Sequence, residues 1–231
     1  MLTKSTCSFA FIPEKTGSKN LWKELNILSP FIKGIKKALD LIKKPSVIVY
    51  RVNAGFIPSD SWIQDPETGG GRIIGECCHF FDVFNFIEGS EVESIKVDYV
   101  PVDNKSIAAP DNISVSVKYK NGSLCVLIYT SIGNNNLPKE RIEVFVDGKS
   151  FVIDDYRVFE IYGFPPEKIG FSKNKKVLKT QDKGLYYEMF ELAKFLHKEK
   201  SEIIDFNETV KAMEITFLVA DMIHKDGYGK E

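Results

Sequence analysis

An acid and an imidazole stand close together at the start of a predicted helix. Glu76 and His79 are three residues apart, so a helix places their side chains on one face. A carboxylate beside an imidazole orients the ring and raises its basicity, which suits general acid–base catalysis near neutral pH. The same spacing fits a structural pair on a helix surface. A metal site is disfavoured, because no third ligand follows at a convincing spacing.

A second group of polar residues precedes this helix. Arg51 and Asn53 alternate in a β-branched and aromatic segment, so a strand over residues 46–53 points both side chains to one side. Trp62 and Asp65 follow in a loop, where a ring beside a carboxylate suits a sugar-like ligand. These four residues are the predicted substrate contacts. The alternatives are a solvent-facing strand end and a tryptophan that covers the edge of the core.

Three consecutive glycines, Gly69 to Gly71, separate this loop from the helix. Dinucleotide-binding loops need a buried strand directly before their glycines, so that the helix N-terminus receives the pyrophosphate. Residues 64–68 are polar and contain a proline, which excludes such a strand. The glycines therefore predict a turn at which a ligand approaches the backbone closely, or a plain flexible turn. No residue is predicted to bind a cofactor or a metal ion.

Composition narrows the class of protein. The 231 residues carry 31 basic and 32 acidic side chains, a balance that argues against a nucleic-acid binder. No apolar run reaches the length of about 18 residues that a membrane span needs, and the first 13 residues lack a signal-peptide pattern. Four cysteines without C-x-x-C spacing indicate reduced thiols. Neighbouring helical residues point about 100° apart, so one of Cys77 and Cys78 is expected to face the core, as a buried rather than a catalytic thiol. We therefore expect a soluble cytoplasmic protein.

The hydrophobic pattern predicts helices and strands in separate blocks. Helical spacing marks four segments: 22–43, 73–87, 185–196 and 210–223. Alternation and β-branched residues mark strands at 46–53, 95–102, 114–119, 124–129, 142–146 and 151–153, with weaker strands at 157–162 and 175–179. Asn121-Gly122 and Asp147-Gly148 predict two-residue hairpin turns, which make the strands they join antiparallel.

These blocks predict an α+β fold, an open and mostly antiparallel sheet with helices packed on one face. Residues 1–24 are expected to form an atypical N-terminal segment, and residues 25–231 a single domain. The sheet is rich in aromatic and β-branched residues, and its other face needs cover. This composition predicts a homo-oligomer that associates through the sheet face.

The chain resembles the C-terminal domain of the Gfo/Idh/MocA (glucose–fructose oxidoreductase/inositol dehydrogenase) family, in its bi-domain branch, over about residues 25–225. The matching residues are Ser29-Pro30, Tyr50-Arg51-Val52-Asn53-Ala54-Gly55, Asp65-Pro66-Glu67, Gly69-Gly70-Gly71-Arg72-Ile73-Ile74-Gly75-Glu76, His79-Phe80 and the closing helix pair from Gly184. The resemblance implies NAD(P)-dependent hydride transfer at a hydroxyl-bearing carbon of a sugar or cyclitol. It also implies a sheet domain like that of glyceraldehyde-3-phosphate dehydrogenase, which shapes the substrate site and the subunit interface.

In this resemblance the family histidine falls on His79, as the acid/base group, with Glu76 as its orienting partner. The chain departs from the family pattern at three motifs, one of which is the Arg-rich stretch expected before Ser29-Pro30, replaced here by Asn26-Ile27-Leu28. The acid that often precedes the histidine by four residues falls on Gly75, and Glu14-Lys15 is followed by Thr16 instead of the proline of the family's Glu-Lys-Pro motif. The lysine role is therefore not carried over.

The sequence shows no Rossmann domain, although hydride transfer needs a nicotinamide held against the substrate carbon. We expect the substrate-binding and oligomerisation half of an NAD(P)-dependent dehydrogenase, completed by a Rossmann-domain partner chain and not catalytically complete alone. The alternatives are a non-enzymatic module that binds a ligand or a protein, and a decayed reading frame whose product only folds. The sequence identifies neither the substrate nor the choice between NAD and NADP.

Overall fold

The computed structural model describes residues 25–65, 68–100, 110–200 and 206–225. The expected N-terminal segment 1–24 and the Pro66-Glu67 part of the loop motif lie outside these residues. The helical elements are η2 (Leu25–Leu28), α1 (Pro30–Ile42), η3 (Ile73–Cys77), α2 (Cys78–Glu88), η4 (Pro166–Ile169), α3 (Leu185–Leu196) and α4 (Phe206–Lys225). The strands are β1 (Val47–Asn53), β2 (Val92–Tyr99), β3 (Ile113–Tyr119), β4 (Leu124–Thr130), β5 (Glu140–Val146), β6 (Lys149–Asp154), β7 (Val158–Tyr162) and β8 (Lys175–Val177).

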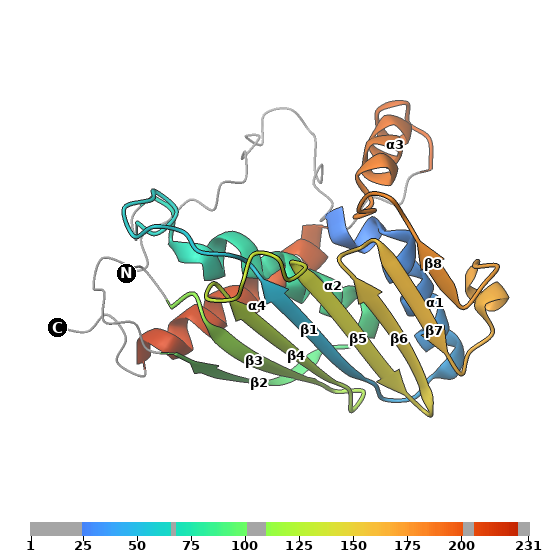
Figure 1. The fold of residues 1–231 in the computed structure, drawn as a ribbon, viewed down its shortest axis with the longest axis horizontal. Helices are drawn as coiled ribbons and strands as arrows, with labels where there is room; N and C mark the ends of the chain where they lie inside the picture. Colours follow the sequence, from blue (N-terminus) through green and yellow to red (C-terminus); the bar gives the residue numbers. More distant parts are fainter. Residues whose placement is uncertain (1–24, 66–67, 101–109, 201–205, 226–231) are drawn as a thin grey trace.

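The strands form one open sheet in the order β2-β3-β4-β1-β5-β6-β7-β8 (Figure 1). Only β1 and β4 pair in parallel, and every other neighbouring pair in this sheet is antiparallel. The α+β class and the mostly antiparallel sheet are thereby confirmed. The sheet is not a simple meander, however, because β1 lies between β4 and β5. Its long connection through α2 supplies the crossover that a parallel pair requires.

Both predicted hairpins form, with different turns. Asp147 and Gly148 have φ values of 46° and 73°, as a two-residue type I′ turn needs. In the other hairpin only Gly122 has a positive φ, at 90°, and its N–H donates to the carbonyl oxygen of Tyr119 (2.9 Å). Tyr119 in turn donates its N–H to Ser123, so the loop holds three residues, with glycine in the left-handed position.

Helix α1 begins at Pro30 and not at residue 22, the start of the predicted range. Ser29 accepts a hydrogen bond from the N–H of Phe31 (3.3 Å), and Pro30 occupies the first helical position. This is the favoured arrangement for a helix start, because a hydroxyl satisfies one orphan donor and proline has none. Residues 25–28 before it form the short helix η2 instead.

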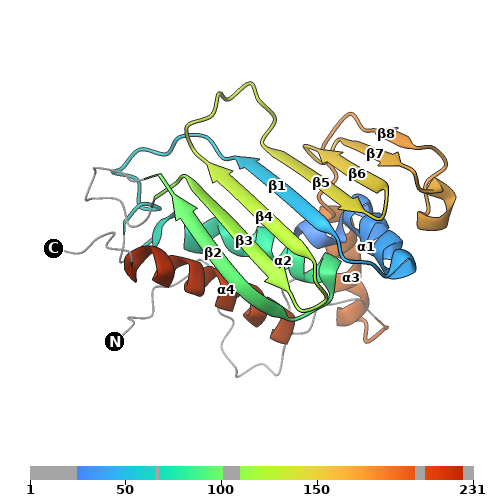
Figure 2. The ribbon, with the colours of Figure 1, turned by 90° about the horizontal axis from the view of Figure 1, so that it is seen from below.

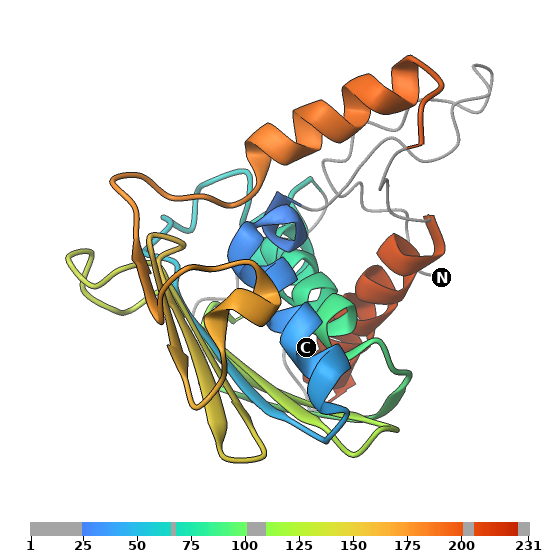
Figure 3. The same cartoon turned by 90° about the vertical axis from the view of Figure 1, so that its right-hand side faces the viewer.

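Helices α1, α2 and α4 cover one face of the sheet, whereas α3 projects beyond them (Figure 3). On β1 the side chains of Ile48, Tyr50 and Val52 point toward these helices and are fully buried. The opposite face stays open, with the helices behind it in Figure 2. Large apolar side chains are exposed on this open face: Val47, Leu124, Ile128, Phe145, Tyr162 and Val177.

Candidate functional site

The three glycines form a turn that favours glycine for two reasons, close approach at Gly69 and positive φ at Gly70 and Gly71. A methyl group at Gly69 would overlap with the carbonyl oxygens of Trp62 and Ile63, so this position needs glycine for close approach. Gly70 and Gly71 have φ values of 70° and 80°, which glycine adopts without strain. The N–H of Gly71 donates to Ile63 (3.0 Å). The turn therefore folds the helix start back onto the loop after β1.

The helix that follows begins with an irregular turn. Ile73–Cys77 is a π-helix, and the chain continues as α2 until Gly89 ends it in the left-handed conformation (φ 58°). The predicted helix and its glycine stop are thus confirmed, while the π-turn is not visible in the hydrophobic pattern. Such turns are rare and occur frequently at functional sites. This one carries Glu76.

The carboxylate of Glu76 lies among three donors. Its Oε2 accepts a hydrogen bond from the hydroxyl of Tyr129 (2.9 Å) and lies 3.7 Å from Nζ of Lys139. Its Oε1 lies 3.4 Å from Nη2 of Arg72. About a third of the Glu76 side chain is exposed (31 %). The acid is therefore fixed in position, partly open to solvent, and flanked by positive charge.

Arg72 fastens this helix to the end of β1. Its side chain is 2 % exposed, and Nη2 and Nη1 donate to the carbonyl oxygens of Ala54 (3.2 Å) and Gly55 (2.5 Å). The guanidinium also lies 5.3 Å from the centre of the Tyr129 ring. A buried arginine is tolerated because its donors meet backbone carbonyls, a carboxylate and an aromatic face at once.

A second buried acid lies next to this cluster. Nε2 of Gln64 donates to Oδ2 of Asp111 (2.7 Å), and both side chains are buried. Burial raises the pKa of Asp111, although the Gln64 hydrogen bond and the charge of Arg72 act in the opposite direction. Burial, and secondarily Glu76, also raises the pKa of the Cys77 thiol. Cys77 and Cys78 are both buried, where the sequence predicts one, and such a thiol stays protonated and unreactive.

Several buried polar atoms have no hydrogen-bond partner among the described residues. Two acceptors and one donor of this kind belong to the cluster: Gln64 Oε1, Asp111 Oδ1 and Arg72 Nε. The others belong to residues outside the cluster, and one of them, Asn53 Oδ1, packs against Gly133. A buried polar atom without a partner is costly.

Arg51 and Asn53 anchor a loop in this structure. Nη1 of Arg51 donates to the carbonyl of Pro138 (2.8 Å), and Nδ2 of Asn53 donates to those of Asn134 (2.8 Å) and Leu137 (3.2 Å). These bonds hold the connection between β4 and β5, which delivers Lys139 to Glu76. The side chains of Arg51 and Asn53 alternate on β1 with Tyr50 and Val52, which face the helices. It is Lys139, at the end of the loop, that reaches Glu76. The contact of Arg51 and Asn53 with a substrate stays a prediction.

The remaining predicted site residues, Trp62, Asp65 and His79, are close to Glu76 in the sequence. Trp62 is 60 % exposed and available for ring stacking. Oδ1 of Asp65 accepts hydrogen bonds from the N–H (2.7 Å) and the hydroxyl (2.9 Å) of Thr68, which shapes the turn before the glycines. His79 is half-buried on α2, just after the π-turn. The roles of His79 as acid/base and of Glu76 as its orienter stay predictions.

Five residues of the cluster were not identified from the sequence as site residues: Gln64, Arg72, Asp111, Tyr129 and Lys139. Arg72 directly follows the three glycines, and only its place in that motif could have drawn attention to it. Tyr129 reads as an ordinary buried strand residue. Asp111 and Lys139 flank strands in polar segments, where nothing in the local pattern marks them.

The described residues contain no group of three or more His, Cys, Asp or Glu side chains that could hold a metal ion. No helix among them is both long enough and apolar enough to span a bilayer.

Comparison with protein families identifies part of the chain. Residues 45–152 match the family model described as the GFO/IDH/MocA C-terminal domain, which confirms the resemblance that the motifs indicate. This range includes β1, the glycine turn, α2 and the sheet as far as β6. Among curated proteins no match was found.

Several solved structures share the fold. The WlbA dehydrogenase from Bordetella pertussis, in complex with NADH and UDP-GlcNAcA, superposes with a TM-score of 0.70 at 16% identity, over 92% of this chain and 64% of its own. An aldose-aldose oxidoreductase from Caulobacter crescentus, complexed with glycerol, gives 0.69 at 13% identity, over 92% and 64%. The UDP-N-acetylglucosamine 3-dehydrogenase GnnA from Acidithiobacillus ferrooxidans gives 0.64 at 15% identity, over 87% and 60%. The chain thus spans less than two thirds of each.

Proposed function

Because residues 45–152 of this chain form a GFO/IDH/MocA C-terminal domain, we propose that it binds the substrate of a nicotinamide-dependent oxidoreductase. The substrate class is a sugar-like or cyclitol compound that reacts at a hydroxyl group. Two of the structural neighbours support this class by their names, since one is complexed with UDP-GlcNAcA and NADH and another is a UDP-N-acetylglucosamine 3-dehydrogenase.

The observation that carries this proposal is the polar cluster around Glu76, whose carboxylate is partly exposed and held by Arg72, Tyr129 and Lys139. The exposed part of the cluster offers a carboxylate that accepts hydrogen bonds and an ammonium group that donates them. A hydroxyl group both donates and accepts, so a polyhydroxylated ligand can bind both groups directly or through bridging water. The exposed ring of Trp62 adds a stacking surface for the apolar face of a sugar.

Within this site His79 accepts the proton of the reacting hydroxyl, and Glu76 orients the imidazole ring of His79. An imidazole titrates near neutral pH, which suits proton transfer in both directions. Lys139 places a positive charge 3.7 Å from the Glu76 carboxylate. A positive charge at this position would stabilise a developing alkoxide on a substrate bound beside it.

The described residues do not fit a dinucleotide. Their single sheet contains one parallel pair, and the glycine turn follows a loop rather than a strand. The coenzyme, NAD or NADP, would therefore be held by a Rossmann domain on another part of the protein or on a partner chain. The role open to these residues is to bind the substrate and to move its proton.

A second candidate function is a non-enzymatic module that binds the same kind of ligand, or a protein. The poor fit to a dinucleotide favours it. The two functions differ in one property. An oxidoreductase half gains activity from a coenzyme-binding partner, whereas a binding module gains none.

Substrate binding is tested by thermal unfolding with UDP-N-acetylglucosamine, UDP-glucose, inositol and free sugars. At least one of these compounds is expected to raise the melting temperature in a saturable way. Trp62→Ala and His79→Ala are each expected to weaken that ligand about tenfold, the cost of one lost stacking or hydrogen-bonding partner. His197→Ala, at an exposed histidine beyond α3, is the matched control and should leave binding unchanged.

Two outcomes contradict the proposed substrate site. One is that none of the compounds shifts the melting temperature in a saturable way, and the other is that the shift remains in both variants. Titration with NADH and NADPH completes the experiment. Tight binding of either by this chain alone would contradict a coenzyme held elsewhere.

The open face of the sheet is the proposed oligomer interface. Val47, Leu124 and Phe145 lie side by side on neighbouring strands, and Ile128 and Tyr162 extend the same face. Their side chains are 37 to 52 % exposed. A continuous apolar surface over several strands is typical of subunit interfaces, because isolated monomers rarely leave such a patch in water.

This interface predicts that the native chain is a dimer or larger in light scattering. The pair Ile128→Lys with Phe145→Lys places two charges in the interface and is expected to give a monomer. Leu41→Lys, at an exposed apolar position on α1 (56 %), is the control and should leave the assembly intact. A monomeric wild type, or an assembly that withstands the double substitution, contradicts the proposal.

A further inference from the structure

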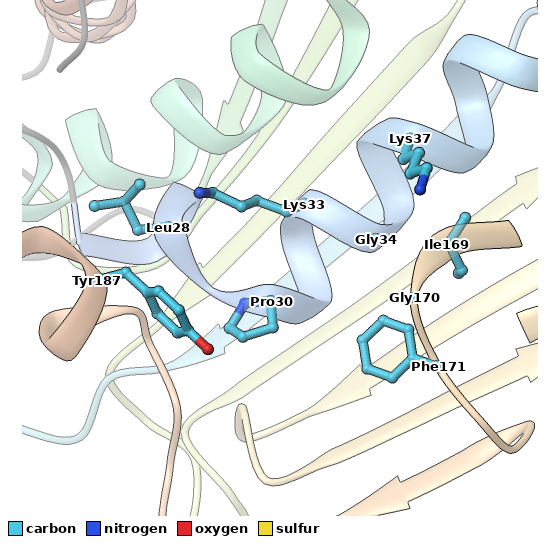
Figure 4. A pocket seen from close by; sticks show the side chains of 9 residues that line it. All are labelled: Leu28, Pro30, Lys33, Gly34, Lys37, Ile169, Gly170, Phe171 and Tyr187. Atoms are coloured by element: carbon cyan, nitrogen blue, oxygen red, sulfur yellow. The ribbon is translucent and has the colours of Figure 1, made fainter. Parts of the chain in front are cut away.

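A pocket lies between α1, η4 and the start of α3, away from the candidate site (Figure 4). Its volume is about 290 Å³, near the lower end for small-molecule sites. No residue of the candidate site contributes to it. The lining residues are Leu28, Pro30, Lys33, Gly34, Lys37, Ile169, Gly170, Phe171 and Tyr187.

The floor of this pocket is a fixed aromatic ring. Phe171 packs against Phe159 (4.9 Å between ring centres) and Phe31 (6.1 Å), so the core holds its orientation. Its ring also approaches the backbone of α1 at Gly34, where a methyl group would lie 2.9 Å from Cε2. The surface is therefore formed before any ligand arrives, which lowers the entropic cost of binding.

The charged residues of the lining are both basic. Lys33 and Lys37 lie one turn apart on α1, and no acidic residue lines the pocket (Figure 4). Lys33 also lies over the ring of Tyr187 (6.0 Å). Lys36, the neighbour of Lys37, pairs with Asp40, whereas Lys37 has no acidic partner within the described part of the chain.

We propose that this pocket binds an organic anion that carries its charge on an apolar ring. The ring would lie on Phe171 and the apolar side chains of Pro30 and Ile169. The negative group would be drawn to the ammonium groups of Lys33 and Lys37, and the hydroxyl of Tyr187 adds a donor. A phosphate ester suits two ammonium groups better than a carboxylate does, because it carries close to two negative charges at neutral pH.

The test is an NMR titration of the full chain, followed through the backbone amide signals of Gly34 and Gly170. Phenyl phosphate is the complete probe, inorganic phosphate supplies charge without a ring, and phenyl β-glucoside supplies a ring without charge. Phenyl phosphate is expected to bind with a dissociation constant on the order of 1 mM, as befits a ligand of this size. Each partial probe should bind at least about tenfold more weakly.

Two variants decide whether the pocket is responsible. The pair Lys33→Gln with Lys37→Gln is expected to weaken phenyl phosphate at least about tenfold. Lys36→Gln, on the same helix but outside the lining, should leave its affinity unchanged. The proposal is overturned by no saturable shift at Gly34 and Gly170, by equal affinity for inorganic phosphate, or by equal losses in the control. None of these outcomes depends on the sugar-like substrate of the proposed function.

Discussion

Replacing Gly69 by alanine is expected to lower the free energy of unfolding by about 3 kcal/mol or more. A methyl group there meets the carbonyl oxygens of Trp62 and Ile63, and these atoms belong to the backbone. The loop can yield only by giving up the hydrogen bond between Gly71 and Ile63 and those from Gly69 and Gly70 to Asp65. Urea denaturation of the variant and the wild type measures the difference.

Gly75→Ala is the matched control for this substitution. Gly75 lies six residues further along, in the π-turn, and a methyl group there meets nothing within 4 Å. The free energy of unfolding should stay unchanged or rise by up to about 1 kcal/mol, since alanine favours helical backbone more than glycine does. Equal unfolding free energies of the two variants would show that the turn does not depend on the close approach of Gly69 to the carbonyl oxygens of Trp62 and Ile63.

Replacing Arg72 by methionine is expected to cost about 3 kcal/mol of stability and to abolish ligand binding at the candidate site. Methionine retains much of the apolar stem but none of the donors. The carbonyl groups of Ala54 and Gly55 lose their partners, and Glu76 loses its buried counter-charge. The end of β1 would then no longer be tied to the helix that presents Glu76.

Arg157→Met controls for the loss of an arginine as such. Arg157 donates to the carbonyl of Lys179 (2.7 Å) at an exposed position, where water replaces the lost bond. Its substitution is expected to change the unfolding free energy by less than about 1 kcal/mol. The account of Arg72 is wrong if both substitutions have similar effects, or if Arg72→Met retains ligand affinity.

The sequence predicts most of the fold because its signals are local. Alternation in residues 114–119 and 124–129 marks β3 and β4, and Asp147-Gly148 closes the next hairpin as expected. The position of β1 between β4 and β5 is not local. It depends on pairing between segments more than 70 residues apart, such as Val47 with Leu124, for which a hydrophobic pattern carries no register.

The candidate site is predictable only in part, for the same reason. Glu76, His79 and the glycines form one continuous motif, whose residue types indicate chemistry without knowledge of the fold. Tyr129 on β4 and Lys139 just before β5 contact Glu76. Asp111 contacts Gln64, which is 47 residues away in the sequence. Spatial neighbours of this kind become visible only when the sheet is assembled. The π-turn also escapes periodicity, since it shifts the helical repeat by a single residue.

The most direct test of the central claim is hydrogen–deuterium exchange with and without the sugar or sugar nucleotide that stabilises the chain. The account predicts slower exchange in residues 54–65, in the glycine turn and π-turn over residues 68–77, and in the loop over residues 131–139. These segments contain Gln64, Arg72, Glu76 and Lys139 of the polar cluster. Protection confined to other segments, such as the pocket beside α1, would contradict a substrate site at the end of β1.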